Sequence, residues 1–484
     1  MAEVNGGYSS RNIRSRVFKA LSVFGFVQAL TVVCQIVRTK FTALWIGATG
    51  TGLIGLYNST MDILTNVSQL NMRQSAVADI SAADGESRAV LAVALRRLML
   101  LAGIAGTILT AALSPLLSMW TFGDTAHTLT FMLIAPMLLF SAVASAEHAL
   151  MQSYDRLKAL AIANAAATAT AVALSLPLLY FYRVAAIGPV LLLYTVCNCI
   201  FALAYRVKGI RPEKKPSWRH VFLAGQKMMS LGMYMTACFT VSLVFSWVFA
   251  VYLNKYYGTA DVGLYRSGFT LVNGYIGVIF TAISMEYYPR LATGIGRRAL
   301  TRVTVAYQSM LSMGVTAPMI IVFICLCPWI VRILFSTEFE AMTPYVSIAM
   351  TAIPLRAVSW CMAFTLLAKG DGPAYALTET ASSVVCLALN IILFKYMGYA
   401  GLGVAYLLWY AIYMAMVYGI YRHRYGFAVG KRVTTSLLSV TAGAAACLVS
   451  VHFLGPWYSL GLFLPPALIF AARVWNIRTS VNRR

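Results

Sequence analysis

The sequence predicts an all-α polytopic membrane protein with about fourteen transmembrane helices. Two observations carry this prediction. Of the 484 residues, 60% are hydrophobic and only 11% are charged, and the apolar residues gather in stretches long enough to cross a bilayer as helices. A soluble domain has roughly 45–50% apolar and about 25% charged residues, and a helical span needs about 20 apolar residues. The composition therefore excludes a large soluble enzyme, a disordered chain and a secreted disulfide scaffold.

The apolar stretches divide the chain almost evenly, so that no room is left for a large soluble domain. We place the spans at residues 20–44, 53–80, 97–120, 128–152, 158–181, 184–205, 228–253, 263–288, 303–334, 342–368, 374–395, 399–421, 434–453 and 457–474.

Basic residues indicate the orientation of the chain. With the N-terminus in the cytoplasm, 29 of the 38 Lys and Arg residues fall in inside segments, four in outside loops and five within spans. Basic residues of membrane proteins collect on the cytoplasmic side, so this bias predicts that both termini are cytoplasmic. It also explains most of the net charge of +23 without a nucleic-acid partner.

Internal similarity predicts two related halves. The glycine-rich turn at 47–53 resembles 258–264, and the run from Asp155 to Tyr205 resembles the run from Asp371 to Tyr418. We therefore expect an N-terminal six-helix lobe (1–205), a basic cytoplasmic linker (206–220), a second six-helix lobe (221–421) and an extra helix pair with a basic tail (422–484). Six spans per half give parallel repeats, related by a pseudo-twofold axis along the membrane normal.

Motifs for covalent chemistry are missing from the sequence. The C-x-C pairs at 197–199 and 325–327 have no third ligand nearby, so no metal is predicted. The Gly-x-Gly-x-x-Gly run at 50–55 joins two spans and follows no β-strand, so it is not a dinucleotide site. Walker A, H-E-x-x-H and G-x-S-x-G sequences are missing too. We therefore expect a transporter without a cofactor, not an enzyme.

Polar residues form rows at helical spacing on three spans. The rows are Gln28, Thr31, Gln35, Arg38 and Thr42 on span 1; Asn58, Asp62, Thr65, Gln69 and Arg73 on span 2; and Arg266, Thr270, Asn273, Gly277, Thr281 and Ser284 on span 8. Each row lies on one helix face, and three polar faces cannot all point at lipid. They predict a shared water-filled space, although hydrogen bonds that hold the helices together would give the same pattern.

Charged residues within spans are the sharper signal, because an intramembrane Arg costs at least ~2.5–3.5 kcal/mol at a helix centre. Guanidinium groups suit bidentate binding of phosphate and carboxylate, so they favour an anionic substrate. Snorkelling to the interface and structural ion pairs are the alternatives. The predicted substrate-binding residues are Arg38, Lys40, Arg73, Arg266, Arg356, Asp62, Gln69 and Asn273.

Acidic groups within spans are candidates for binding a coupling ion. We select Asp62, Glu147 and Glu379, which would use a proton or sodium gradient. The alternative role is that of counter-charges for the arginines.

The turn at 40–53, with six residues between Lys40 and Gly-x-x-Gly-x-Gly-Leu, resembles Wzx-type oligosaccharide flippases. So do Gly-Leu-Tyr-Arg-Ser-Gly at 263–268, Tyr-Tyr-Pro-Arg-Leu at 287–291, and the segment 334–342. This family belongs to the multidrug/oligosaccharidyl-lipid/polysaccharide (MOP) exporter superfamily.

The resemblance implies two six-helix lobes in a V shape, as in the MATE transporters of this superfamily. It also implies alternating access and a basic cavity for pyrophosphate and sugar. The implied substrate is an undecaprenyl-pyrophosphate-linked oligosaccharide, moved to the periplasmic leaflet of the bacterial inner membrane for O-antigen (lipopolysaccharide) or other polysaccharide synthesis. A monomer that contacts the polysaccharide polymerase machinery would fit this role.

Other functions stay open. The extra helix pair at 422–484 is similar to that of lipid II flippases, and a cation-coupled multidrug antiporter of the same superfamily would need an acidic cavity. A membrane polymerase or acyltransferase would need a large outer loop, which the sequence lacks.

Overall fold

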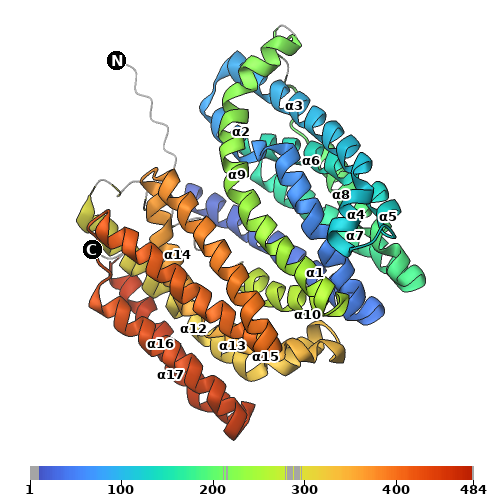
Figure 1. Cartoon of the computed structure of the whole chain (residues 1–484). Helices are drawn as coiled ribbons and strands as arrows, with labels where there is room; N and C mark the ends of the chain where they lie inside the picture. The colour runs from blue at the N-terminus through green and yellow to red at the C-terminus, as the bar shows by residue number, and fades with distance from the viewer. Residues whose placement is uncertain are drawn as a thin grey trace, which may run out of the picture. The chain divides into compact units, whose positions relative to one another are not determined.

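The computed structural model describes residues 10–481, except 211, 214–215, 278–279, 281–286, 288–290, 292–294 and 296. Side chains are described from residue 30 to 476, apart from those gaps and positions 231 and 275. The described residues form helices and connecting turns and contain no strand (Figure 1). The predicted all-α class is confirmed, and the number of long apolar helices makes this a multi-pass membrane protein.

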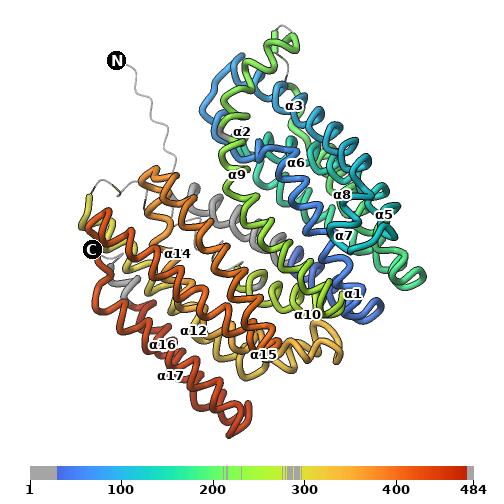
Figure 2. The backbone as a smooth tube through the Cα atoms, viewed as in Figure 1, coloured from blue at the N-terminus to red at the C-terminus, as the bar shows by residue number. Residues whose placement is uncertain are grey.

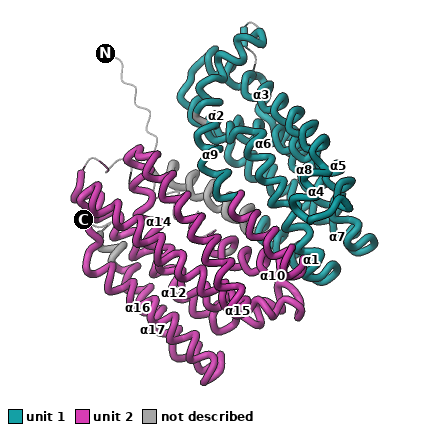
Figure 3. Tube along the Cα trace, viewed as in Figure 1, with its two compact units in different colours: residues 1–243 teal, residues 244–484 magenta. Residues whose placement is uncertain are grey.

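The chain divides into two compact units, residues 1–243 and 244–484, with the boundary inside one continuous helix, α9 (Figure 3). The lobe boundaries expected from the repeat stay a prediction.

Unit 1 holds the first nine helices, the last of them in part, one short turn of helix, and more than one apolar cluster. Its elements are α1 (Ser10–Gln69), α2 (Met72–Ala82), α3 (Gly85–Ala112), α4 (Ser114–Phe122), α5 (Thr128–Ile134), α6 (Met137–Ser153), α7 (Leu157–Tyr182), η1 (Arg183–Ala186), α8 (Ile187–Ala204) and the first part of α9 (Trp218–Tyr256). One apolar cluster joins α2, α3, α6 and α9, and another joins α1, α4, α5 and α8.

Unit 2 continues from α9 with helices of very different lengths. Its elements are α10 (Thr259–Phe269), η2 (Thr270–Tyr275), α12 (Arg298–Leu334), η3 (Thr337–Met342), α13 (Thr343–Met350), α14 (Ile353–Ala368), α15 (Gly372–His423), α16 (Lys431–Leu454) and α17 (Pro456–Val481). The last two helices run beside α12, and the residue pair Gly314 and Val474 marks a close approach of α12 to α17 (Figure 2).

The long apolar helices agree with the predicted spans once their kinks are considered. Eight helices, or nine with one bent pair, are long and apolar enough to cross a membrane within the described residues. The stretches 157–204 and 372–423 count once each, yet each holds two predicted spans. The helix α1 holds the predicted span 1 and most of span 2, but it is not among the helices that are apolar enough to count. Span 8, which is incompletely described, is not among them either. Spans 1, 2 and 8 are the three that carry the polar rows.

Three predicted spans are interrupted. Span 2 breaks after Gln69, where Leu70 and Asn71 take left-handed φ angles of 47° and 46°, and α2 then begins. Span 4 is split into α5 and α6 at Pro136, which cannot donate a backbone hydrogen bond. Span 10 bends by 54° between the η3–α13 segment and α14, where Pro354 lies in the first turn.

Glycine lies at the kinks inside the two long helices α1 and α15. In α1, Gly47 has φ 65° and ψ −168°, and in α15, Gly398 has φ 58° and ψ −136°. These angles are strained for any residue with a Cβ atom. Each kink lies between two predicted spans, so it reverses the chain at a membrane surface without a long loop.

More than half of the exposed aromatic side chains among the described residues lie at the predicted outer ends of the spans. They are Trp120, Tyr180, Phe181, Tyr182, Tyr256, Tyr257, Tyr396, Phe453, Trp457 and Tyr458. Aromatic rings concentrate at membrane–water interfaces, where their apolar body and polar edge are both accommodated. Their position agrees with the span ends drawn from the sequence.

The first turn of α15 is held by residues that lie outside the predicted membrane spans. The Asp371 carboxylate accepts hydrogen bonds from the Tyr425 hydroxyl (2.5 Å) and the Ala374 backbone N–H, and it pairs with Arg424 at 3.0 Å. The Tyr425 hydrogen bond contributes most to lowering the pKa of this carboxyl group.

The kink at Gly398 gives a test of the fold. We expect Gly398→Ala to lower the free energy of unfolding by about 1–3 kcal/mol, because Ala must adopt a strained backbone conformation there. No heavy atom outside the local backbone lies within 4 Å of the added Cβ, so a steric clash would not contribute. Denaturant unfolding in detergent would measure the change.

Gly419→Ala is the matched control. Gly419 lies in the same helix, has equally open space for a Cβ, and has no positive φ angle. Ala should stabilise the helix there by up to about 1 kcal/mol. Equal effects at the two positions would contradict the assignment of backbone strain to Gly398.

Candidate functional site

The strongest polar cluster within the helices of unit 2 centres on Arg356. Its Nη1 donates to Asn273 Oδ1 at 2.9 Å and to the Tyr406 hydroxyl at 3.2 Å. Tyr406 in turn donates to Asn273 Oδ1 at 3.0 Å. The structure thus brings together two predicted site residues, Arg356 and Asn273, that lie 83 positions apart.

Aromatic rings enclose the Arg356 guanidinium as well. Its Cζ atom lies 5.2 Å from the centre of the Phe280 ring and 5.8 Å from that of Tyr410, both within cation–π range. Because the two hydrogen bonds use only Nη1, the other N–H groups of this five-donor side chain are available for a ligand within the described structure.

Arg356 lines a cavity of about 330 Å³ between α14 and α15. The rings of Trp360, Phe364, Tyr375, Trp409, Tyr410 and Tyr413 form much of its wall. Glu379 also lines it and accepts a hydrogen bond of 2.6 Å from the Tyr413 hydroxyl. The cavity therefore combines one cation, one carboxylate and several aromatic faces.

The helix α15 carries a row of aromatic residues that reaches from the Arg356 cluster, at Tyr406, to the cavity wall, at Tyr410 and Tyr413. Tyr406, Tyr410 and Tyr413 recur at intervals of four and three, so they share one buried face, and Trp409 donates to the Ser382 hydroxyl at 2.7 Å. This row was not predicted as part of a site. Its spacing was visible in the sequence, but aromatic residues are common in apolar spans and carried no separate signal.

Unit 1 holds a second polar cavity, of about 530 Å³, between α1, α6, α7 and α8. Hydroxyl and amide groups line it, among them Thr31, the first described side chain of the predicted span 1 row. The predicted residue Gln69 reaches its wall by donating to Ser141 Oγ at 2.7 Å. Arg38 is exposed and places its guanidinium 4.9 Å from the ring centre of Tyr194, another wall residue.

The other predicted substrate residues lie outside both cavity walls. Lys40 is half-buried on α1, and Asp62 is exposed on the same helix. Arg73 on α2 is half-buried and close enough to the buried His148 for their charges to interact. Arg266 on α10 is half-buried, and its carbonyl accepts the Thr270 hydroxyl at 2.9 Å. Gln28, Thr281 and Ser284 of the predicted rows lie outside the side chains that the structure describes.

Glu147, a predicted coupling-ion residue, forms an ion pair. Arg96 Nε and Nη2 donate to its two carboxylate oxygens at 2.7 and 2.9 Å, and Arg96 Nη2 also donates to the Val207 carbonyl. Glu147 is buried, with a side chain 5% exposed. Sequence reasoning missed Arg96 because it was counted with the cytoplasmic basic residues just before span 3.

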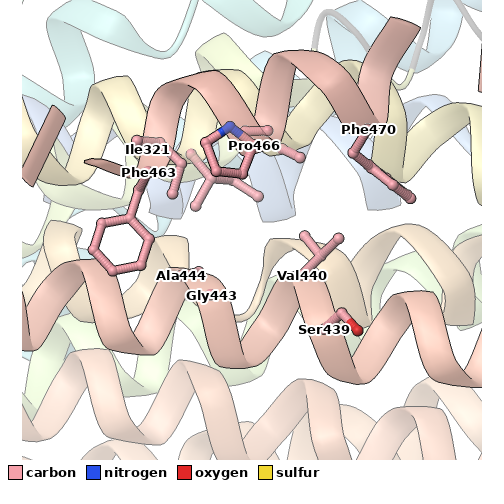
Figure 4. A pocket seen from close by; sticks show the side chains of 11 residues that line it. Ile321, Ser439, Val440, Gly443, Ala444, Phe463, Pro466 and Phe470 are labelled. Atoms are coloured by element: carbon pink, nitrogen blue, oxygen red, sulfur yellow. The ribbon is translucent and has the colours of Figure 1, made fainter. Parts of the chain in front are cut away.

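A third cavity, of about 200 Å³, lies between α12, α16 and α17. Apolar residues such as Ile321, Val440, Phe463 and Phe470 line it (Figure 4). This wall contains no charged residue, so it fits an apolar chain better than a charged group. Among the described residues, no three His, Cys, Asp or Glu side chains lie close enough to hold a metal ion.

Solved structures of transporters share this fold. The chain resembles the lipid II flippase MurJ in an inward closed conformation, with TM-score 0.68, 12% identity, and coverage of 95% of this chain and 98% of that one. It resembles an inward-facing multidrug resistance MATE family transporter of the MOP superfamily, with TM-score 0.68, 11% identity, and coverage of 84% and 95%. It also resembles the eukaryotic MATE transporter AtDTX14, with TM-score 0.55, 14% identity, and coverage of 87% of this chain and 97% of that one. At these identities the likeness concerns the fold.

Coverage also bears on the extra helix pair. Residues 422–484 are 63 of 484, about 13% of the chain, so a match over 95% must include most of them. The MATE matches leave 16% and 13% of the chain uncovered.

The family comparison gives the identity. A family model described as "Polysaccharide biosynthesis protein" matches residues 91–344, which is more than half of the chain. No curated protein matches the sequence closely enough to be counted as a relative. With its helical membrane fold, the chain thus belongs to the polysaccharide biosynthesis protein family and has the architecture of MOP-superfamily flippases and transporters.

Proposed function

We propose that this protein is a flippase for undecaprenyl-pyrophosphate-linked oligosaccharide. It would move the lipid from the cytoplasmic to the periplasmic leaflet by alternating access, for O-antigen or another surface polysaccharide. The observation that carries the proposal is the Arg356 guanidinium, held at the wall of an aromatic-lined cavity within membrane helices. The polysaccharide biosynthesis family supports a saccharide substrate.

The chemistry of such a substrate explains the cavity. A pyrophosphate is anionic and strongly hydrated, so hydrocarbon opposes its passage. Guanidinium N–H groups make charge-assisted hydrogen bonds to phosphate oxygens, which are roughly twice as strong as neutral ones. The hydrogen bonds from Arg356 to Asn273 and Tyr406 hold this cation in place before the ligand arrives. Aromatic faces such as Trp360 and Trp409 would pack on the apolar C–H faces of sugar rings.

No covalent step is needed in this function. The polyprenyl tail would stay in the bilayer while the head group crosses, and two compact units would rock as rigid bodies to expose the site to each side in turn. The other in-span basic residues, Arg38, Lys40, Arg73 and Arg266, would contribute to a basic path for the head group, together with Asp62 and Gln69.

Driving force and location complete the proposal. Glu379 is the best candidate for a coupling residue, because it lines the cavity and is absent from the ion pairs among the described residues. A proton or sodium gradient would act there. We place the protein in a bacterial cytoplasmic membrane, as a monomer with both termini inside, where it could contact the polysaccharide polymerase.

A lipid II-type substrate is the second candidate, favoured by the MurJ likeness over 95% of this chain. Both candidates share an undecaprenyl pyrophosphate, so they differ in the glycan. A cation-coupled drug antiporter would instead rely on acidic groups, and the walls of the three cavities described above carry one, Glu379.

The test of the substrate is flipping in sealed vesicles. Purified protein is reconstituted with fluorescent undecaprenyl-pyrophosphate saccharides, of lipid II type and of O-antigen type, and an external sugar-modifying reagent reports their exposure. We expect Arg356→Gln to slow flipping by about tenfold or more, because a charge-assisted hydrogen bond is lost. Arg38→Ala and Arg266→Ala should also slow it.

Arg332→Gln is the matched control for Arg356→Gln. Arg332 is an exposed residue of the same unit, ion-paired with Glu340, and its loss should leave the rate unchanged. Flipping at the wild-type rate by Arg356→Gln would remove Arg356 from the site. Failure of wild type to flip either lipid, with uptake of a cationic dye under an ion gradient, would replace the flippase by the antiporter.

The carboxylates of Glu379 and Glu147 should respond differently to removal of their charge. Glu379→Gln should abolish the dependence of flipping on a proton or sodium gradient. Glu147→Gln should keep that dependence but lower the free energy of unfolding by about 1–3 kcal/mol, because Arg96 loses its partner. The double variant Arg96→Gln/Glu147→Gln should recover part of this loss.

Gradient-imposed vesicles and denaturant unfolding measure the two effects. Full gradient dependence in Glu379→Gln would exclude it as the coupling residue. Loss of that dependence in Glu147→Gln, with unchanged stability, would assign the coupling role to Glu147.

A further inference from the structure

The cavity of unit 1 differs in chemistry from the Arg356 cavity. Its volume of about 530 Å³ lies in the range of roughly 300–1,000 Å³ that is usual for small-molecule sites. None of its wall residues is Asp, Glu, Lys, Arg or His. The wall is nevertheless polar, because hydroxyl, amide and phenol groups form much of it.

Two neighbouring helices direct polar rows at this cavity. Asn164 and Thr168 are four residues apart on α7, and Tyr194 and Asn198 are four residues apart on α8. The rest of α7 and α8 is rich in Ala, Leu and Val, so these rows are local departures from apolar helices. Side-chain amides are expensive in a membrane helix unless they meet polar partners.

Hydroxyl groups of the wall direct their own protons away from the cavity. Thr168 Oγ1 donates to the Asn164 carbonyl at 2.8 Å, and Ser141 Oγ donates to the Leu138 carbonyl at 3.1 Å. Their lone pairs are therefore the groups they can offer to a ligand. Asn198 lines the cavity as well, and its buried Oδ1 accepts no hydrogen bond from the described residues, so a small rotation of this amide would offer a ligand a further acceptor or donor.

This arrangement selects for a neutral ligand with many O–H donors. An anion would find no cation on the wall, and a cation would find no carboxylate. Outside the wall, Arg38 lies over the ring of the wall residue Tyr194, and Glu147 is paired with Arg96. Apolar residues Leu160, Ala161 and Ala167 leave room for the C–H faces of a ring.

We propose that the unit 1 cavity binds uncharged glycosyl residues of the transported lipid, through hydroxyl donors that reach Asn164, Thr168 and Asn198. The proposal rests on the flippase function for the source of these sugars, and it separates recognition of glycan from recognition of pyrophosphate. The Arg356 cavity would bind the anionic pyrophosphate, and the unit 1 cavity would bind the neutral sugars.

Binding of two lipids to the protein in nanodiscs tests this assignment. The probes are undecaprenyl pyrophosphate without sugar and the same lipid carrying a neutral trisaccharide, and the readout is the ratio of their dissociation constants. We expect the trisaccharide to strengthen binding to wild type at least tenfold. Asn164→Ala/Asn198→Ala should bring this ratio close to one without changing the affinity for the sugar-free lipid.

Two further variants keep the test decisive. Asn390→Ala removes a buried amide of unit 2 that bonds to Cys386, and it should keep the wild-type ratio. Thr168→Val conserves shape and removes one hydroxyl, so it should reduce the ratio even if the double variant folds poorly. An unchanged ratio in the folded variants, or an equal loss of affinity for both lipids, would overturn the assignment.

A third arm separates this proposal from the flippase function. If wild type binds neither lipid, the flippase proposal fails, and binding of free chitotriose decides the cavity. Chitotriose binding that Asn164→Ala/Asn198→Ala abolishes and Asn390→Ala keeps would support a glycosyl site. No chitotriose binding in that case would indicate a water-filled packing cavity and overturn the proposal.

Discussion

The need to give every buried polar group a partner is the constraint on which the structure depends. Hydrocarbon offers no hydrogen bonds, so a charge within a helix bundle must be held by other side chains. Arg356 shows the result, because one of its nitrogens joins Asn273 of η2 to Tyr406 of α15 while rings cover its faces. A cation that is fixed in this way costs little further reorganisation when an anion arrives.

The same constraint holds together the predicted cytoplasmic side of unit 1. Arg96 pairs with Glu147 and also donates to the Val207 carbonyl, and the next residue, Arg97, donates to the Pro216 carbonyl at 2.7 Å. Glu86 accepts the backbone N–H of Glu213. The described parts of the segment 206–217, within the predicted basic linker 206–220, are therefore held against α3.

Composition and periodicity predicted the helical class, the span positions and the polar rows. Composition and periodicity could not predict which side chains of different helices bond to one another. Asn273 and Arg356 were both selected for their chemistry, but the bond between them depends on the bend before α14 and on the packing of α15. Glu147 was selected without Arg96, since no local pattern joins residues 51 positions apart. The aromatic row of α15 resembles ordinary membrane helix sequence and becomes a cavity wall only through its neighbours.

The backbone angles at the turns agree with the internal repeat that the sequence predicts, even where the residues differ. Gly47 and Gly258, which the repeat aligns at an offset of 211, both have positive φ angles, 65° and 112°. Arg183 and Gly398, at an offset of 215, also share positive φ angles of 48° and 58°, although one is arginine. An arginine in this region is strained, so the turn itself, and not the preference of the residue, must be what the two halves retain. A chain reversal between two membrane helices allows few backbone solutions, and this explains how the turns stay alike while the cavities beside them differ in charge.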